Sequence, residues 1–128
     1  MAFPGTYNIS YYMGDTYEFN VYPKNASGGT FSLASYTDFD FVIAEVAGAD
    51  GVAGRVNCFA VVSDDNTYVR CAIRPEDALS LDPSKDYVYD VQIAKNVDGD
   101  DYPYVYTLLT GSISITDQVT PVVDTDIS

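Results

Sequence analysis

Apolar and polar side chains alternate along most of this chain with the period of two that is typical of β-strands. The clearest case is the segment 87–93, in which every second residue is large and apolar: Tyr87, Tyr89, Val91 and Ile93. Asp90 and Gln92 fall on the opposite face. A strand with one buried and one solvated face has this pattern, so we predict a central strand here.

The same pattern predicts six further strands. They are Thr6–Tyr12, Thr16–Tyr22, Phe39–Val46, Arg55–Ser63, Thr67–Arg74 and Tyr104–Thr116. A helical turn is expected over 75–81, because Pro75 is followed by two acidic residues. About seven strands, with turn signals about every ten residues, predict an all-β fold, an antiparallel β-sandwich.

The residues before the central strand refine this prediction. The spacing Leu81-x-Pro83-x-x-x-Tyr87 is similar to the tyrosine corner of immunoglobulin-like sandwiches. In that motif a tyrosine near the start of a late strand turns its hydroxyl back onto the upstream backbone. The sandwich is therefore expected to be immunoglobulin-like, and its Tyr87 hydroxyl to bind the segment that precedes it.

Segments 55–63 and 67–74 read as a hairpin joined by Asp64-Asp65, or by a slightly wider loop ending at Asn66. A loop centred between 64 and 65 would place Cys58 opposite Cys71 on the core face. A disulfide between them is one reading. Buried free thiols are the favoured one, because the chain opens with no secretion signal and is expected to be made in the cytosol.

The last strand has its own predicted face. Alternation places one set of side chains on the core side, namely Val105, Thr107, Leu109, Ile113 and Ile115. The glycine between them, Gly111, predicts a bulge or bend.

The chain of 128 residues fits one domain. We expect that domain to span residues 1–116, with an extended N-terminal arm and with 117–128 as an extended C-terminal tail.

Composition narrows the possible functions. The chain has 6 Lys and Arg against 19 Asp and Glu, a net charge of −13, which disfavours binding to nucleic acid and to membranes. It has no histidine, so Ser-His-Asp catalysis and zinc sites built on histidine are excluded. No catalytic residue and no cofactor is expected.

The acidic loop of 98–101 is the one candidate for a cation site. Asp98, Asp100 and Asp101 supply the carboxylates that calcium prefers, but they lack the spacing of a known calcium loop. A plain hairpin turn is the favoured reading, and a structural cation stays open.

The chain is unusually rich in tyrosine, with 12 residues. Tyr side chains combine a large apolar body with a polar tip, which suits protein interfaces. Two local concentrations predict an interface, and its residues are Tyr11, Tyr12, Tyr102, Tyr104 and Tyr106. If Val105 points inward, the last three rings lie together on the outer face; ordinary strand propensity is the alternative reading.

Several motifs together resemble the small immunoglobulin-like domains of tailed-bacteriophage virions. They are Gly14-Asp15-Thr16, Phe31-Ser-Leu33 with Tyr36-Thr37, Tyr87–Ile93 followed by Asp98-Gly99, Tyr106–Ile115 and Val119-Thr120. The chain is similar to the N-terminal domain of baseplate upper proteins and to capsid decoration proteins. The tryptophan and inter-sheet disulfide of antibody domains are absent from this pattern.

The resemblance implies a non-enzymatic structural protein of the virion. Its expected partners are the major capsid protein or tail proteins, and itself as a homo-oligomer. A capsid decoration or cement protein, or a minor head protein, is the first expectation. The alternatives are a tail, baseplate or tail-fibre adaptor, a carbohydrate-binding or adhesion domain, and a bacterial cytosolic domain of unrelated role.

Overall fold

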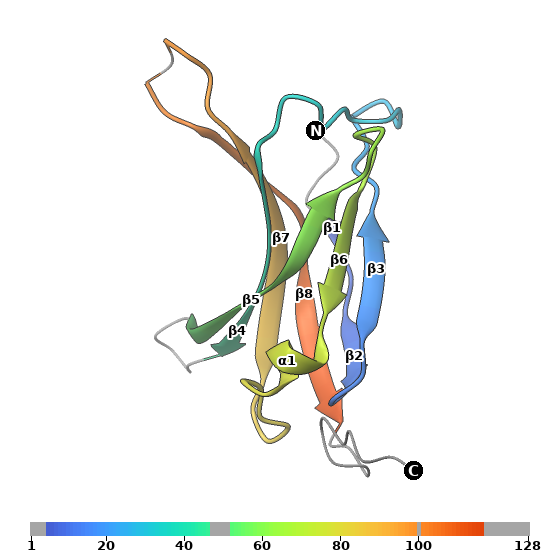
Figure 1. Ribbon diagram of the computed structural model, residues 1–128, viewed down its shortest axis with the longest axis vertical. Coiled ribbons are helices and arrows are strands. Elements are labelled where there is room, and N and C mark those ends of the chain that lie inside the picture. The colour runs from blue at the N-terminus through green and yellow to red at the C-terminus, as the bar shows by residue number, and fades with distance from the viewer. Residues whose placement is uncertain (1–4, 47–51, 100, 117–128) are drawn as a thin grey trace.

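The computed structural model describes residues 5–46, 52–99 and 101–116, which form eight strands and one short helix (Figure 1). The elements are β1 (Gly5–Thr6), β2 (Ile9–Tyr12), β3 (Tyr17–Val21), β4 (Asp38–Val46), β5 (Val52–Val62), β6 (Val69–Ile73), α1 (Pro75–Ala78), β7 (Tyr87–Lys95) and β8 (Tyr104–Thr116). The predicted all-β, sandwich-like fold is confirmed. The predicted tail of 117–128 lies outside the described residues, as do residues 1–4 of the predicted N-terminal arm.

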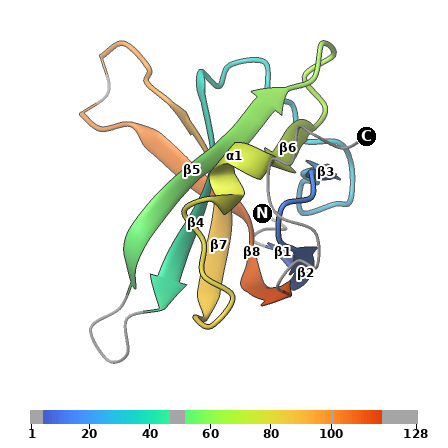
Figure 2. The ribbon, with the colours of Figure 1, turned by 60° about the horizontal axis from the view of Figure 1, so that its bottom comes forward.

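The strands follow the order β1-β8-β7-β4-β5-β6-β3, with β2 also on β8. Strand β5 belongs to both layers, since its first part pairs with β4 and its last part with β6. The sheet therefore curls over at β5 so that β6 and β3 face the larger layer (Figure 2).

The sheet is mixed rather than purely antiparallel. Strands β1 and β2 run parallel to β8, with Gly5 beside Leu109 and Ile9 beside Ile113. Parallel pairing joins strands that are far apart in the chain, which a hairpin pattern in the sequence does not reveal. From Gly5 onward the predicted N-terminal arm is therefore part of the sheet.

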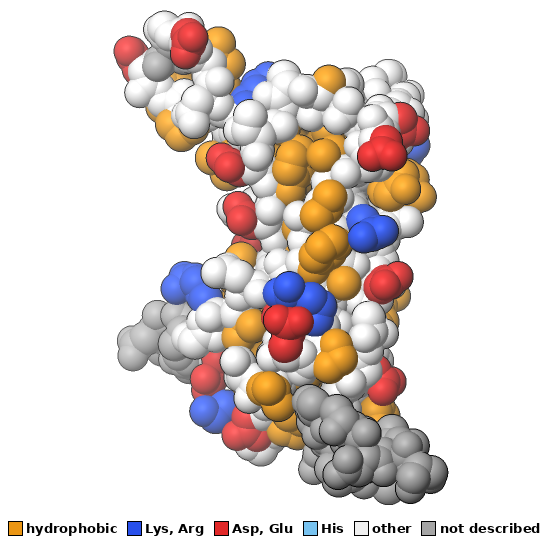
Figure 3. Space-filling model, in the orientation of Figure 1, with side chains coloured by type: hydrophobic (Ala, Val, Ile, Leu, Met, Phe, Trp, Pro, Cys, Tyr) orange, Lys and Arg blue, Asp and Glu red, His pale blue; other side chains and the backbone are white. Residues whose placement is uncertain are grey.

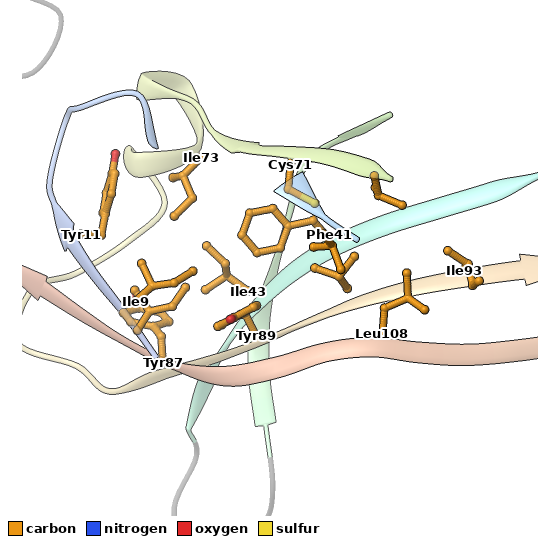
Figure 4. Close-up of a cluster of buried hydrophobic side chains, with 14 of the residues drawn as sticks. Ile9, Tyr11, Phe41, Ile43, Cys71, Ile73, Tyr87, Tyr89, Ile93 and Leu108 are labelled. Atoms are coloured by element: carbon orange, nitrogen blue, oxygen red, sulfur yellow. The ribbon is translucent and has the colours of Figure 1, made fainter. Parts of the chain in front are cut away.

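The core lies between the two layers and confirms the alternation of the central strand. The side chains of Tyr87, Tyr89, Val91 and Ile93 on β7 are all buried. Figure 4 shows Phe41, Ile43 and Tyr89 pointing into one interior from neighbouring strands. The Phe41 ring meets Phe19 of the opposite layer edge to face, with ring centroids 5.2 Å apart.

The tyrosine corner is present. Tyr87 begins β7 and is buried, and its hydroxyl oxygen accepts a hydrogen bond of 2.8 Å from the Asp82 N–H. This bond ties the segment after α1 to the first residue of the central strand, as the Leu81-x-Pro83-x-x-x-Tyr87 spacing predicts.

Replacing Tyr87 with phenylalanine should lower the free energy of unfolding by about 1 kcal/mol, because the Asp82 N–H loses its partner. Urea denaturation of both proteins measures the difference. Tyr102→Phe is the matched control, since Tyr102 is 67% exposed and should change nothing measurable. Equal losses in the two variants would show that the corner bond is not stabilising.

The predicted helical turn is also present, in a shortened form. In α1 the Asp77 carboxylate caps the helix by accepting the Arg74 N–H at 2.9 Å. It also binds the Arg74 guanidinium through Nε and Nη2, both at 3.0 Å. Three donors thus satisfy the oxygens of this buried carboxylate.

The predicted hairpin register is wrong by two residues. Cys71 lies opposite Ala60, so it is not the partner of Cys58. The loop is wider than two residues because Ser63 N–H binds Tyr68 O at 2.9 Å and Asn66 adopts a left-handed φ of 60°. A shift of two preserves the face of each side chain, and both cysteines are free thiols on the core side.

The bulge in β8 lies at Leu108 rather than at Gly111. Val91 pairs with Leu109 and Gln92 with Thr107, so Leu108 is an extra residue between these pairs. It is buried, and it reverses which side chains face the core. The prediction of which side chains face the core is confirmed from Leu109 onward. It is wrong before Leu108, because Val105, which was expected to face the core, is 51% exposed.

Candidate interaction surface

The hairpin of β7 and β8 extends past the body of the sandwich and forms a projecting arm (Figure 1). Its strands pair as far as Lys95 with Tyr104. The ladder between β7 and β8 gives the base of the arm a regular backbone, so side chains there alternate between two faces. We call the described residues 94–99 and 101–106 the arm.

Aromatic rings and one lysine cover one face of the arm. The rings of Tyr102 and Tyr104 lie 5.8 Å apart. Lys95 Nζ lies 5.7 Å from the Tyr104 ring centroid and 4.8 Å from that of Tyr36, and it also donates to Ser35 Oγ at 3.4 Å. A cation between two ring faces is attracted to both, so Lys95 links the arm to the segment before β4.

The base of this surface is anchored in the core. The Tyr36 ring is buried and lies 6.2 Å from the Tyr106 ring and 5.8 Å from the Phe31 ring. Burial raises the pKa of Tyr36, and the nearby Tyr106 raises it further. The series therefore passes from the buried Tyr36 to the largely exposed Tyr102. We call Tyr36, Lys95, Tyr102, Tyr104 and Tyr106 the aromatic surface.

The structure thus brings together three of the five predicted interface residues, on a different face from the one expected. Tyr104 and Tyr106 are partly buried on the core side of the sheet, and Val105 points to the opposite, exposed side. The reason is the extra residue Leu108, which inverts the alternation in this part of β8.

The other two predicted residues are elsewhere. Tyr11 is 1% exposed, and its hydroxyl donates to the Asp15 carbonyl at 2.7 Å, so a surface role for Tyr11 is wrong. Tyr12 is exposed on β2, at the end of the molecule away from the arm (Figure 1). Consecutive residues of a strand face opposite sides, so Tyr11 and Tyr12 do not share a face.

Lys95 and Tyr36 are the residues that sequence reasoning missed. The signal for Lys95 was a lone basic residue at the end of the central strand, in a chain with few basic residues. Tyr36 lies in an irregular segment, and its pairing with the arm depends on tertiary packing.

Acidic groups occupy the far end of the arm. Figure 3 shows acidic and hydrophobic side chains together there, and Asp98 and Asp101 are exposed. In the part of the chain that the structure describes, no three acidic, cysteine or histidine side chains cluster as a metal site would require. Asp100 lies outside the described residues, so the suggested cation site of Asp98, Asp100 and Asp101 stays a prediction.

A polar depression of about 340 Å³ lies on the outer face of β4 and β7. Burial raises the pKa of Asp90 in this depression, and Arg55 lowers it in part. Gln92 and Thr110 supply the other polar groups, and the lining contains no serine, cysteine or histidine. Asp90 and Arg55 are the two charged groups of this lining.

No known family model matches the chain, and a search of curated proteins finds no significant match. Among the described residues no helix has the length and hydrophobicity needed to cross a bilayer. A functional proposal for this chain therefore depends on its sequence and on the geometry of the arm.

Proposed function

We propose that this protein is a non-enzymatic structural protein of a bacteriophage virion, most specifically a capsid decoration or cement protein. It would bind the assembled lattice through the aromatic surface of its arm. The observation that carries the proposal is the projection of this surface beyond the sandwich, with Tyr102 exposed at its end. The motifs that resemble virion proteins agree with this role.

The aromatic surface has the composition of a binding site. A tyrosine side chain has few rotatable bonds, so it loses little conformational entropy on binding, and it offers both an apolar ring and a hydroxyl. Lys95 holds Tyr104 and Tyr36 in a fixed arrangement, so the rings are ordered before a partner arrives. Preorganised contacts lose less entropy when the complex forms.

The charge of the chain supports binding to a protein shell rather than to the packaged genome. A net charge of −13 repels nucleic acid. On a symmetric lattice the same contact is offered at every equivalent position, so one binding mode is enough to decorate the whole shell.

Co-sedimentation tests this proposal. The purified chain is mixed with shells of the phage that encodes it, assembled without it, and separately with tails. We expect it to pellet with shells, and we expect Tyr102→Ala with Tyr104→Ala to weaken binding by roughly tenfold to a hundredfold, as for aromatic hot spots. Titration of the shells gives the dissociation constant of each variant.

Leu79→Ala is the matched control. Leu79 is 63% exposed beside α1, at the opposite end of the molecule from the arm, and its removal should leave shell binding unchanged. Binding to tails alone would contradict the decoration role and favour a tail adaptor. Binding to neither particle would contradict a virion role altogether.

A further inference from the structure

The outer edge of β3 is open. β3 is the last strand in the order of the sheet, so this edge has no strand partner among the described residues. The N-terminal strands β1 and β2, which could have covered it, pair with β8 instead. Unpaired backbone groups along a sheet edge are a template for another strand.

An apolar groove of about 500 Å³ lies beside this edge, between β3 and the pair of β1 and β8. Its apolar walls include Phe19 and Val21 of β3 and Leu108 and Leu109 of β8. Both layers of the sandwich are therefore open on this side, and an added strand would gain backbone pairing and apolar contact together.

The charges along β3 and the residues that follow it are self-complementary. β3 ends at Val21, and exposure still alternates over residues 22–24, in which Tyr22 and Lys24 are exposed and Pro23 is buried. Glu18 and Lys24 lie three residues before and three residues after Val21. When two copies of the segment 18–24 pair antiparallel about a two-fold axis at Val21, each Glu18 lies opposite the Lys24 of the other copy. Opposite charges in facing positions stabilise a strand pair, and like charges destabilise it.

We infer that the segment 18–24, which is most of β3 and its extension, pairs with the same segment of a second copy in this register and forms a symmetric dimer. The grooves of the two copies then lie next to each other across the two-fold axis, which shields their apolar walls from solvent. Pro23 falls opposite Phe19 and provides no N–H, a loss that edge strands tolerate. The inference goes beyond the virion role and does not depend on it.

Charge reversal tests the register. Sedimentation velocity of the purified chain over a range of concentrations should show a reversible dimer. Glu18→Lys alone or Lys24→Glu alone creates two like-charge contacts in each dimer, and each should weaken dimerisation roughly tenfold. The double variant with both changes restores both contacts and should dimerise like the original chain.

A mixture of the two single variants adds a sharper test. One variant then carries two acidic and the other two basic groups at these positions, so they should form a heterodimer although each alone dimerises poorly. Glu76→Lys, an exposed change of the same size in α1, is the control and should leave the dimer intact.

Three outcomes would overturn the inference. They are a monomer at every concentration, a dimer that ignores both single changes, and single variants that neither the double change nor mixing restores. Far-UV circular dichroism of each variant verifies its fold. Because only the purified chain is used, failure here leaves the shell-binding experiment unaffected.

Discussion

Replacing Gly111 with alanine should lower the free energy of unfolding by about 3 kcal/mol, at the upper end of what added methyl groups cost in packed sites. A Cβ at this position would overlap the carbonyl group of Tyr7, with the carbonyl carbon only 2.8 Å away. The Tyr89 ring, 3.1 Å from the same point, adds a second tight contact.

The crowding at Gly111 has a structural cause. The segment between β1 and β2 runs beside β8 at this residue, where Tyr7 N–H binds Thr110 O at 3.0 Å and the Tyr89 hydroxyl donates to Tyr7 O. Alanine would push this segment away from β8 and break both bonds. The loss should appear as a lower urea midpoint together with weaker protection of the β1 and β2 amides from hydrogen exchange.

Gly5→Ala is the matched control for Gly111→Ala. It lies on β1, which pairs with β8, and its added Cβ would make only ordinary contacts, with the Leu109 side chain at 3.6 Å and the Leu108 carbonyl oxygen at 4.0 Å. Its stability should stay within about 0.5 kcal/mol of the original chain, as for most surface changes. Similar losses at both positions would mean that the close backbone approach at Gly111 is not the cause.

Local rules predict the parts of this fold in which one face of a regular strand is buried. The alternation of β7 and the spacing that ends at Tyr87 depend on residues within one segment. The burial of Tyr87 and its bond to Asp82 follow directly from them. Sequence reasoning is reliable here because no distant residue changes the pattern.

The predictions fail where a single backbone irregularity resets the pattern. The extra residue Leu108 moves Val105 to the outside and Tyr106 toward the core, although the residues alternate regularly in the sequence. A loop bound by Ser63 and Asn66 likewise shifts the β5–β6 register and separates Cys58 from Cys71. Each irregularity depends on contacts with other strands or on loop hydrogen bonds, which alternation does not encode.

The aromatic surface is predictable from the sequence only in part. Its three arm tyrosines were predictable from composition, whereas their face depends on the bulge and their anchoring on Tyr36 and Lys95. A binding surface built from two distant segments requires the tertiary fold. The parallel pairing of β1 and β2 with β8, which leaves the β3 edge open, requires it in the same way.

Raising the pH from 7.5 to 10 should cost about 2 kcal/mol of stability through the two core thiols. Burial raises the pKa of Cys58 and of Cys71 from 9.0 to about 12. The unfolded chain therefore ionises its thiols near pH 9, while the folded chain keeps them neutral until about pH 12. This contribution to stability is complete below pH 9 and is lost progressively as the pH rises toward 12.

The size of the effect follows from the difference in pKa. At pH 10 an unfolded thiol that ionises near pH 9 gains about 1.4 kcal/mol. Cys71 is fully buried and should contribute nearly all of this amount, whereas Cys58 is partly exposed and should contribute less. The pKa values of four tyrosines are also raised, namely Tyr11, Tyr17, Tyr36 and Tyr89. An unfolded tyrosine ionises near pH 10, about one unit above a thiol, so these groups contribute mainly above pH 10.

Urea denaturation at a series of pH values, with a reductant present, measures this loss. The double variant Cys58→Ala with Cys71→Ala is the control, because it removes both titrating groups from the core. Its absolute stability changes through packing, so the comparison uses the slope of stability against pH, which should flatten between pH 8 and 10. An equally steep slope in the double variant would show that other groups cause the alkaline loss, and that these thiols are not held neutral by burial between the layers.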